Sequence, residues 1–172
     1  MKNIFYTLCL LSLCSTAQSE SFFGVSYNTF TDLPDGINVD GYAIEYAAVN
    51  DNIFWGLGYA IVDVTDDYGY GVRGDGASAG AAFGVSSFAT GTIYGSAQLI
   101  LAEGETDSAF SVGYAKRKID ELGYDISVSF MDGESSLVAS VRIPVSGTGG
   151  IELQVADSDL STLVGVGFSL GF

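Results

Sequence analysis

The sequence predicts an all-β fold: a single up-and-down antiparallel transmembrane β-barrel of ten strands, with eight strands as the alternative. Residues 163–172 place an apolar side chain at every second position, mostly with glycine or serine between, which is the period of a strand. The chain is 48% hydrophobic, yet only 16% of its residues are charged, against about 25% in soluble domains. After residue 19, no apolar run is long enough for a transmembrane helix.

The first 19 residues read as a secretory signal peptide that is removed, so the barrel is expected over residues 20–172. A basic start is followed by a short apolar run and then by small residues, among them Ala17 and Ser19. Cleavage after either of these two residues satisfies the small-residue rule. Both cysteines, Cys9 and Cys14, lie in this leader, so we expect neither a disulfide nor a cysteine metal site beyond it.

Ten segments of alternating polarity follow the leader, with turn-forming residues between them. Each is about 8–12 residues long, the length that a tilted membrane strand needs. The segments cover about 21–30, 41–48, 53–63, 76–86, 91–102, 108–116, 122–131, 136–144, 150–157 and 162–172. The eighth and ninth are the weakest, because Pro144 cannot donate a hydrogen bond to a ladder. Without that pair the barrel would have eight strands.

The connections between these segments alternate in character. Those after the second, fourth, sixth and eighth segments are short, whereas the others are on average longer and carry most of the acidic residues. With both chain ends on one side, this pattern predicts periplasmic turns at one end of the barrel and external loops at the other.

One phase of each segment carries the large apolar side chains and no charge. We expect this face to contact lipid, because a basic side chain at the bilayer midplane costs about 2–4 kcal/mol on a barrel surface. Aromatic residues gather toward the segment ends, which predicts two belts at the two water–lipid interfaces. The interface aromatics expected on the turn side include Tyr46, Trp55, Tyr114 and Tyr124.

The opposite phase is mostly Gly, Ala, Ser and Thr and is expected to face a narrow, largely filled lumen. The predicted polar network of the lumen comprises Glu45, Asp125, Arg142, Glu152 and Gln154. Arg142 and Glu152 are equidistant from residue 147, so a hairpin turning there would place them opposite each other. The three carboxylates and one guanidinium sum to −2, a charge that favours cations if the lumen conducts. The large groups expected to fill it are Phe54, Tyr94, Met131 and Arg142.

With its leader, its alternating hairpins and its terminal stretch VGFSLGF, the chain resembles the small outer-membrane β-barrels of Gram-negative bacteria, the group that includes OmpX and the OmpA membrane domain. In that group a C-terminal aromatic strand is recognised by the barrel assembly machinery. The resemblance therefore implies that Phe168, Leu170 and Phe172 form an assembly signal. It also implies residence in the cell outer membrane, with outer-membrane lipids and lipopolysaccharide as neighbours. We expect a monomer.

Several functions are disfavoured by the composition. The chain has no histidine, so Ser-His and Asp-His catalytic machinery is absent, and we expect no enzyme, no metal site and no cofactor. A net charge of −15, from 21 acidic and six basic residues, is the opposite of a nucleic-acid footprint. The acids of 63–67 lack EF-hand spacing, and the integrin-binding tripeptide at 73–75 lies in a glycine-rich stretch typical of a turn.

These observations favour a structural or surface-interaction role in the cell envelope. The alternative is a narrow, weakly cation-selective channel for small solutes or ions. A soluble secreted β-sandwich is the third hypothesis, and it predicts recovery without detergent.

Overall fold

The computed structural model describes residues 21–31, 33, 36–50, 53–88, 91–116, 120–159 and 161–172, without the side chains of 49–50 and 87–88. The leader expected over residues 1–19 lies outside these described residues. Among them, no helix has the length and apolar character needed to cross a bilayer.

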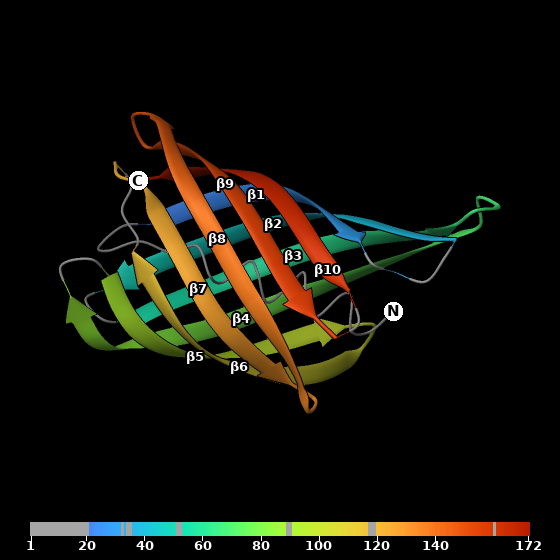
Figure 1. Ribbon diagram of the computed structural model, residues 1–172, viewed down its shortest axis with the longest axis horizontal. Helices are drawn as coiled ribbons and strands as arrows, with labels where there is room; N and C mark the ends of the chain where they lie inside the picture. Colours follow the sequence, from blue (N-terminus) through green and yellow to red (C-terminus); the bar gives the residue numbers. More distant parts are fainter. Residues whose placement is uncertain are drawn as a thin grey trace.

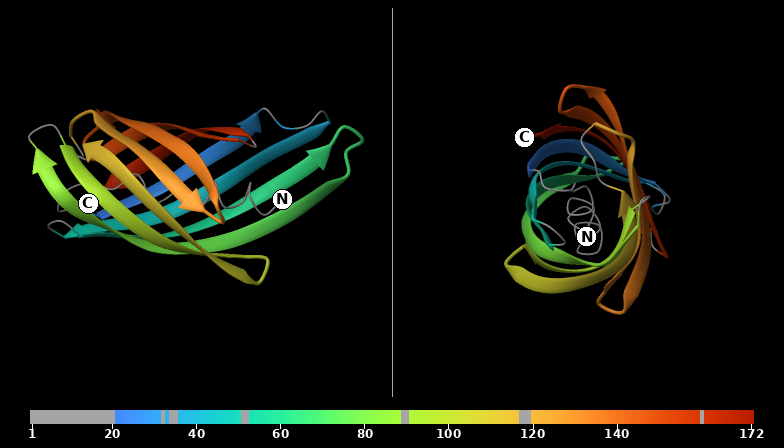
Figure 2. Two further views of the ribbon diagram at one scale, coloured as in Figure 1. Left: turned by 60° about the horizontal axis from the view of Figure 1, so that its bottom comes forward. Right: turned by 90° about the vertical axis from the view of Figure 1, so that its left-hand side faces the viewer.

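Ten strands run through the described residues, and all ten predicted segments are strands. Their bounds are β1 Ser21–Thr31, β2 Ile37–Asn50, β3 Ile53–Asp66, β4 Gly71–Phe88, β5 Gly91–Ala102, β6 Glu105–Lys116, β7 Gly123–Met131, β8 Glu134–Ser146, β9 Gly149–Ser158 and β10 Thr162–Gly171. Each strand pairs antiparallel with its sequence neighbours, and β1 pairs with β10, so the sheet closes on itself. The fold is therefore the predicted ten-stranded up-and-down barrel (Figures 1 and 2).

The seam between β1 and β10 is held from end to end. Phe22 pairs with Gly171 near one end and Thr31 with Thr162 at the other. Beyond this ladder, the backbone N–H of Phe172 donates to Ser21 O at 2.9 Å, and that of Ser21 donates to Phe172 O at 3.0 Å. The last residue of the chain thus completes the closure of the barrel.

The strands at the loop end are longer than the sequence pattern indicates, and the loops are correspondingly shorter. β2 begins at Ile37 and β4 at Gly71, so the β3–β4 hairpin projects beyond its neighbours (Figure 1). Two loop-end connections are tight turns whose two central residues have positive φ, Glu103-Gly104 and Asp132-Gly133, as a type I′ hairpin requires. The connections are therefore only slightly longer on average at the loop end than at the turn end, and much of the acidic sequence lies on strand ends.

Two register shifts mark strand ends on the turn side. One lies between Gly84 and Ser86 on β4, and the other between Pro144 and Ser146 on β8. A bulge leaves one residue out of the ladder, which is where a strand tolerates proline. β8 therefore continues past Pro144, the residue at which the sequence pattern ends it.

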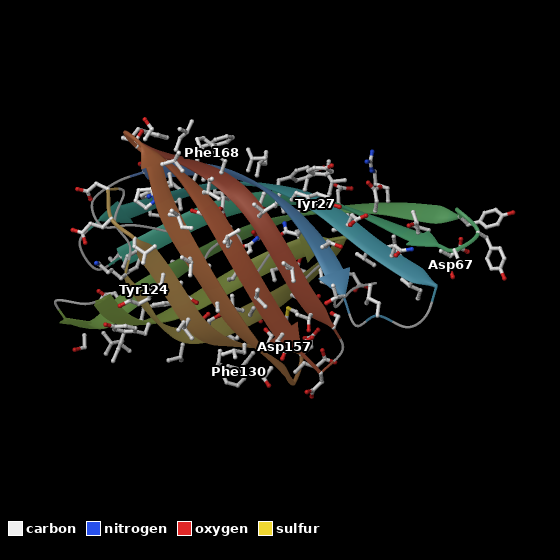
Figure 3. All side chains as sticks on the ribbon, turned by 45° about the horizontal axis from the view of Figure 1, so that its top comes forward. Tyr27, Asp67, Tyr124, Phe130, Asp157 and Phe168 are labelled. Carbon is white, nitrogen blue, oxygen red and sulfur yellow. The ribbon has the colours of Figure 1, made fainter. Side chains whose placement is uncertain are left out.

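The outer surface of the barrel is apolar over most of its height. Large hydrophobic side chains alternate outward on every strand, as on β10 with Val164, Val166, Phe168 and Leu170. Aromatic pairs form toward both ends: Tyr46 and Trp55 lie 5.5 Å apart between ring centroids on the turn side, and Tyr27 and Tyr42 lie 5.1 Å apart on the loop side. In Figure 3, Tyr124 and Phe168 lie toward one end, and Tyr27 and Phe130 toward the other.

Candidate functional site

The residues of the predicted polar network all belong to the inward phase of their strands. Glu45 lies on β2, Asp125 on β7, Arg142 on β8, and Glu152 and Gln154 on β9. Asp125, Arg142 and Glu152 are buried. The register pairs Arg142 directly with Glu152, as the spacing about residue 147 predicts. The closest approach of the pair, from Arg142 Nε to Glu152 Oε1, is 3.9 Å.

Arg142 extends along the inner wall. A Cβ placed on Gly150, on the neighbouring strand, would lie 2.6 Å from Cζ of Arg142, so the guanidinium lies flat over that glycine. Beyond it, Nε donates to Ser169 Oγ on β10 at 3.0 Å, and Nη2 donates to the carbonyl of Thr148 at 3.0 Å. Cζ also lies 5.7 Å from the ring centroid of Phe22 on β1.

Two further long polar side chains lie along the wall in the same way. Tyr94 on β5 covers Gly113 of β6, where a Cβ would lie 2.7 Å from its hydroxyl oxygen, and donates to Asp125 Oδ1 of β7 at 2.7 Å. Gln154 on β9 covers Gly165 of β10 and donates to Asn28 Oδ1 of β1 at 2.6 Å. Each of the three side chains thus joins its own strand to the second strand along by passing over a glycine.

The fourth long side chain, Glu45, covers Gly24 of β1, where a Cβ would lie 2.7 Å from its Oε1. On β9, the Oε1 atom of Glu152 is buried and has no hydrogen-bond partner. The Arg142 guanidinium at 3.9 Å is too far to supply one. The Oε1 atom of Glu152 is therefore unsatisfied on the inner wall.

The sequence pattern did not single out the residues that make these arrangements possible. Gly113, Gly150 and Gly165 appear in it only as small inward residues, and Ser169 and Asn28 have no assigned role. A usable signal does exist: Gly113 pairs with Tyr94 and Gly165 with Gln154 in the register, and Gly150 lies one inward position from Glu152, the partner of Arg142. That signal becomes readable only once strand pairing is known.

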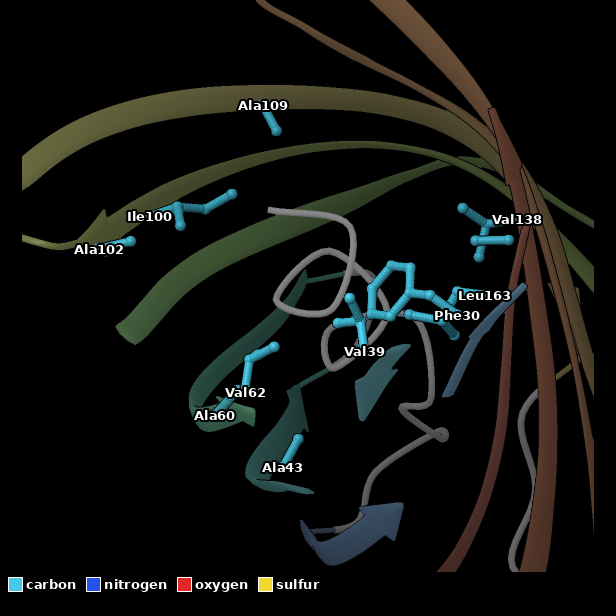
Figure 4. Packing of buried hydrophobic residues seen from close by; sticks show 11 residues of the cluster. Phe30, Val39, Ala43, Ala60, Val62, Ile100, Ala102, Ala109, Val138 and Leu163 are labelled. Atoms are coloured by element: carbon cyan, nitrogen blue, oxygen red, sulfur yellow. The ribbon is translucent and has the colours of Figure 1, made fainter. Parts of the chain in front are cut away.

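The loop half of the inner wall is mostly apolar below the loop rim. Eleven buried hydrophobic residues form one cluster there, and five of them are alanine: Phe30, Val39, Ala43, Ala60, Val62, Ile100, Ala102, Ala109, Val138, Ala156 and Leu163. Figure 4 shows them distributed around the wall. We call this ring of side chains the apolar collar. Small serines, Ser78 and Ser136, lie on the same half of the wall, whereas the charged residues of the predicted network lie on the turn half.

The remaining predicted residues lie on the outside. Trp55 and Phe168 are exposed on the outer face, and Tyr46 contacts both Trp55 and Phe172, the latter with ring centroids 6.3 Å apart. Tyr114 and Tyr124 form a second turn-side pair, 6.0 Å apart. Leu170 is exposed on the same face as Phe168. The predicted interface aromatics and the terminal strand therefore share one outer belt at the turn end.

The projecting β3–β4 hairpin has its own charged pair. The Arg73 guanidinium donates to both carboxylate oxygens of Asp63, at 2.8 and 2.9 Å. This hydrogen bonding lowers the pKa of the Asp63 carboxyl below its ordinary value. Arg73 is thus engaged within the hairpin. The two tyrosines at its tip, Tyr68 and Tyr70, are 87% and 80% exposed. In the part of the chain that the structure describes, no three metal-ligating side chains form a group.

Comparisons with known proteins add little to this geometry. No family model matches the sequence, and no curated protein matches it. Among solved structures, the barrel is similar to a KdgM porin in complex with disordered oligogalacturonate, with a TM-score of 0.47 and 6% sequence identity over 89% of this chain and 99% of that one. No specific family of the OmpX or OmpA type is shown.

Proposed function

We propose that this chain is an integral outer-membrane β-barrel that forms a narrow, weakly cation-selective channel for small solutes or ions. Membrane insertion is supported by the outer surface. Ten residues of strand extend about 33 Å, or about 25 Å along the axis at a tilt of 40°, which is the height of an outer-membrane apolar band. β10, with ten residues, presents Val164, Val166, Phe168 and Leu170 outward, and its one polar outward residue, Thr162, lies at the loop end.

The observation that carries the channel is the course of the long side chains inside. Ten strands about 4.8 Å apart, tilted by about 40°, enclose a backbone radius of about 10 Å. Arg142 and Tyr94, two of the groups expected to fill that space, lie along the wall over Gly150 and Gly113. The apolar collar is built largely from alanine and valine, which reach only a fraction of the radius. This arrangement favours the channel over a plugged barrel.

Selectivity follows from the charges on the inner wall. The network contributes three carboxylates, Glu45, Asp125 and Glu152, and one guanidinium, Arg142, for a formal sum of −2. The loop end adds further acids. An excess of carboxylates concentrates cations near a pore and repels anions, more strongly at low salt. We therefore expect K⁺ to carry more current than Cl⁻.

Recording from planar bilayers tests this proposal. Purified barrel that migrates as a heat-modifiable band should give discrete current steps, with a smaller preference for cations at high salt. Folded barrel that gives no steps would contradict the channel.

Membrane insertion has its own test, because Trp55 is the single tryptophan. It lies on the outer face near the turn end, so lipids brominated high on the acyl chain should quench its fluorescence. A control chain carrying Trp55→Phe and Tyr68→Trp moves the fluorophore to the hairpin tip, where quenching should be lost. Equal quenching of both chains would contradict the insertion.

A surface-interaction role is the second candidate, favoured by the exposed Tyr68 and Tyr70 at the projecting tip. Asp66 Oδ1 accepts hydrogen bonds from the backbone N–H groups of both tyrosines, at 3.0 and 2.8 Å, which fixes the turn that presents them. Cells producing Tyr68→Ser with Tyr70→Ser should lose surface adhesion if this role holds. Unchanged adhesion would rule out the tip as the contact.

A further inference from the structure

The inner wall of the barrel changes character twice between its loop end and its turn end. Acidic residues lie on the inward phase at the loop rim, with Asp107 paired to Ile100 and Glu134 to Met131. The apolar collar follows, and the polar network lies nearest the turns. A solute entering from the loop end therefore meets negative charge first, then apolar surface, and then negative charge again.

We infer that the lumen binds small amphiphilic cations, molecules with one positively charged head and a short apolar tail. This inference rests on the proposed lumen and names the class of molecule that it takes. An inorganic ion buries no apolar surface against the collar, and a neutral apolar solute is not attracted electrostatically to the acidic residues. A cation with an alkyl tail matches both features of the wall.

The collar supplies the surface for the tail. Val138 and Ala156 pair across β8 and β9, and Leu163 pairs with Ala156 across β9 and β10. These three inward residues form a continuous apolar strip over three strands. Phe30, the partner of Leu163 on β1, extends the strip across the seam. Burial of a methylene group against such a strip contributes about 0.8 kcal/mol at most.

Glu152 supplies the counter-charge for the head. It lies on β9 two inward positions nearer the turns than Ala156, with Gln154 between them, so it is on the turn side of the strip. Glu152 is 8% exposed to solvent, and its Oε1 atom has no hydrogen-bond partner. A buried carboxylate oxygen without a partner is costly, and a positively charged head would reduce that cost. Arg142 offsets part of the charge at 3.9 Å, but Glu45 and Asp125 leave the wall negative in sum.

Binding is tested by calorimetric titration of the barrel in nanodiscs, with empty nanodiscs subtracted. The probes are hexyltrimethylammonium, tetramethylammonium with the same charge and no tail, and hexanesulfonate with the same tail and the opposite charge. Hexyltrimethylammonium should bind at least about tenfold more tightly than either of the other two. Similar affinities for all three, or binding of hexanesulfonate as tight as that of hexyltrimethylammonium, would overturn the inference.

Two variants locate the site. Val138→Thr puts a hydroxyl into the strip and should weaken the binding of hexyltrimethylammonium about fivefold. Val128→Thr makes the same change on the outer face and should leave the affinity for hexyltrimethylammonium unchanged. Glu152→Gln should also weaken binding about fivefold, and it removes an unsatisfied charge, so the barrel should still fold. Wild-type affinity in both inward variants would overturn the inference. Binding does not require conduction, so a silent barrel that still binds the probe would contradict the channel alone.

Discussion

Substitution of Gly150 tests whether the wall-lying side chains leave the lumen free. In Gly150→Ala, the new Cβ would lie 2.6 Å from Cζ of Arg142 and 2.7 Å from its Nε and Nη2. Carbon and nitrogen atoms cannot approach so closely, so the guanidinium has to leave the wall. The backbone of β9 is held by ladders on both sides and cannot move away. The side chain is displaced toward the barrel axis.

The expected effect follows from the dimensions. An arginine reaches about 6 Å from its Cα, more than half of a backbone radius of about 10 Å. We expect conductance to fall about twofold or more, and the preference for cations to weaken because a positive charge now lies in the path. Loss of the bonds to Ser169 and Thr148, together with overpacking, should lower the free energy of unfolding by about 1–3 kcal/mol.

Single-channel recording measures this effect, and the chain offers two controls. Gly95→Ala adds the same methyl group where the nearest atom is 4.0 Å away, so its conductance should match the wild type. Combining Gly150→Ala with Arg142→Ser removes the displaced group and should restore conductance. Wild-type conductance in folded Gly150→Ala, or no recovery in the double variant, would refute the reasoning.

Three further predictions concern the network, the seam and the hairpin. Tyr94→Phe deletes the donor to buried Asp125 and should lower the free energy of unfolding in urea by about 1.5–3 kcal/mol. The control Tyr42→Phe, at an exposed tyrosine, should leave the free energy of unfolding almost unchanged. Equal effects of the two substitutions would contradict the role of the Tyr94–Asp125 hydrogen bond. Phe172→Ser removes the ring beside Tyr46 and should slow the appearance of the heat-modifiable band, whereas an unchanged rate would contradict an assembly signal. The Asp63 carboxyl should titrate by NMR at a pKa below its ordinary value, and in Arg73→Gln this pKa should return toward the ordinary value. Because the pKa is lowered in the folded state, the stabilisation by this pair is complete above the ordinary pKa. It is lost as the pH falls through the lowered pKa of the folded state.

The sequence predicts this fold well where one face of a strand has to be apolar. Alternation in 163–172 and in the nine segments before it locates every strand, because a period of two is required wherever lipid lies on one side. The pair 136–144 and 150–157, the weakest in sequence, is a true hairpin whose bulge accommodates Pro144.

The strand ends could not be predicted in the same way. Gly71 to Asp75 reads as a loop, since it contains three glycine or charged positions in a row, yet it pairs with β3 in a regular ladder. Outside the apolar band, both faces of a hairpin contact water, so no alternation of polarity is required. The sequence pattern therefore does not predict where the strands end there. Backbone pairing alone extends the hairpin there.

The inner wall shows the same limit at the level of side chains. The inward position of Glu45, Asp125, Arg142 and Glu152 follows from strand phase. The direction in which a long side chain leaves the wall depends on its neighbour across the ladder, and Gly113, Gly150 and Gly165 decide it in three cases. The direction of these side chains therefore depends on which residues pair across neighbouring strands. The sequence of a single strand does not contain that register.

The most direct test of the channel is the reversal potential of the wild-type barrel in a planar bilayer under a tenfold KCl gradient. We predict discrete current steps whose reversal potential has the same sign as the equilibrium potential of K⁺. The reversal potential should move closer to zero as the total salt concentration increases. A folded barrel without current steps, or a reversal potential of the sign set by Cl⁻, would contradict the account.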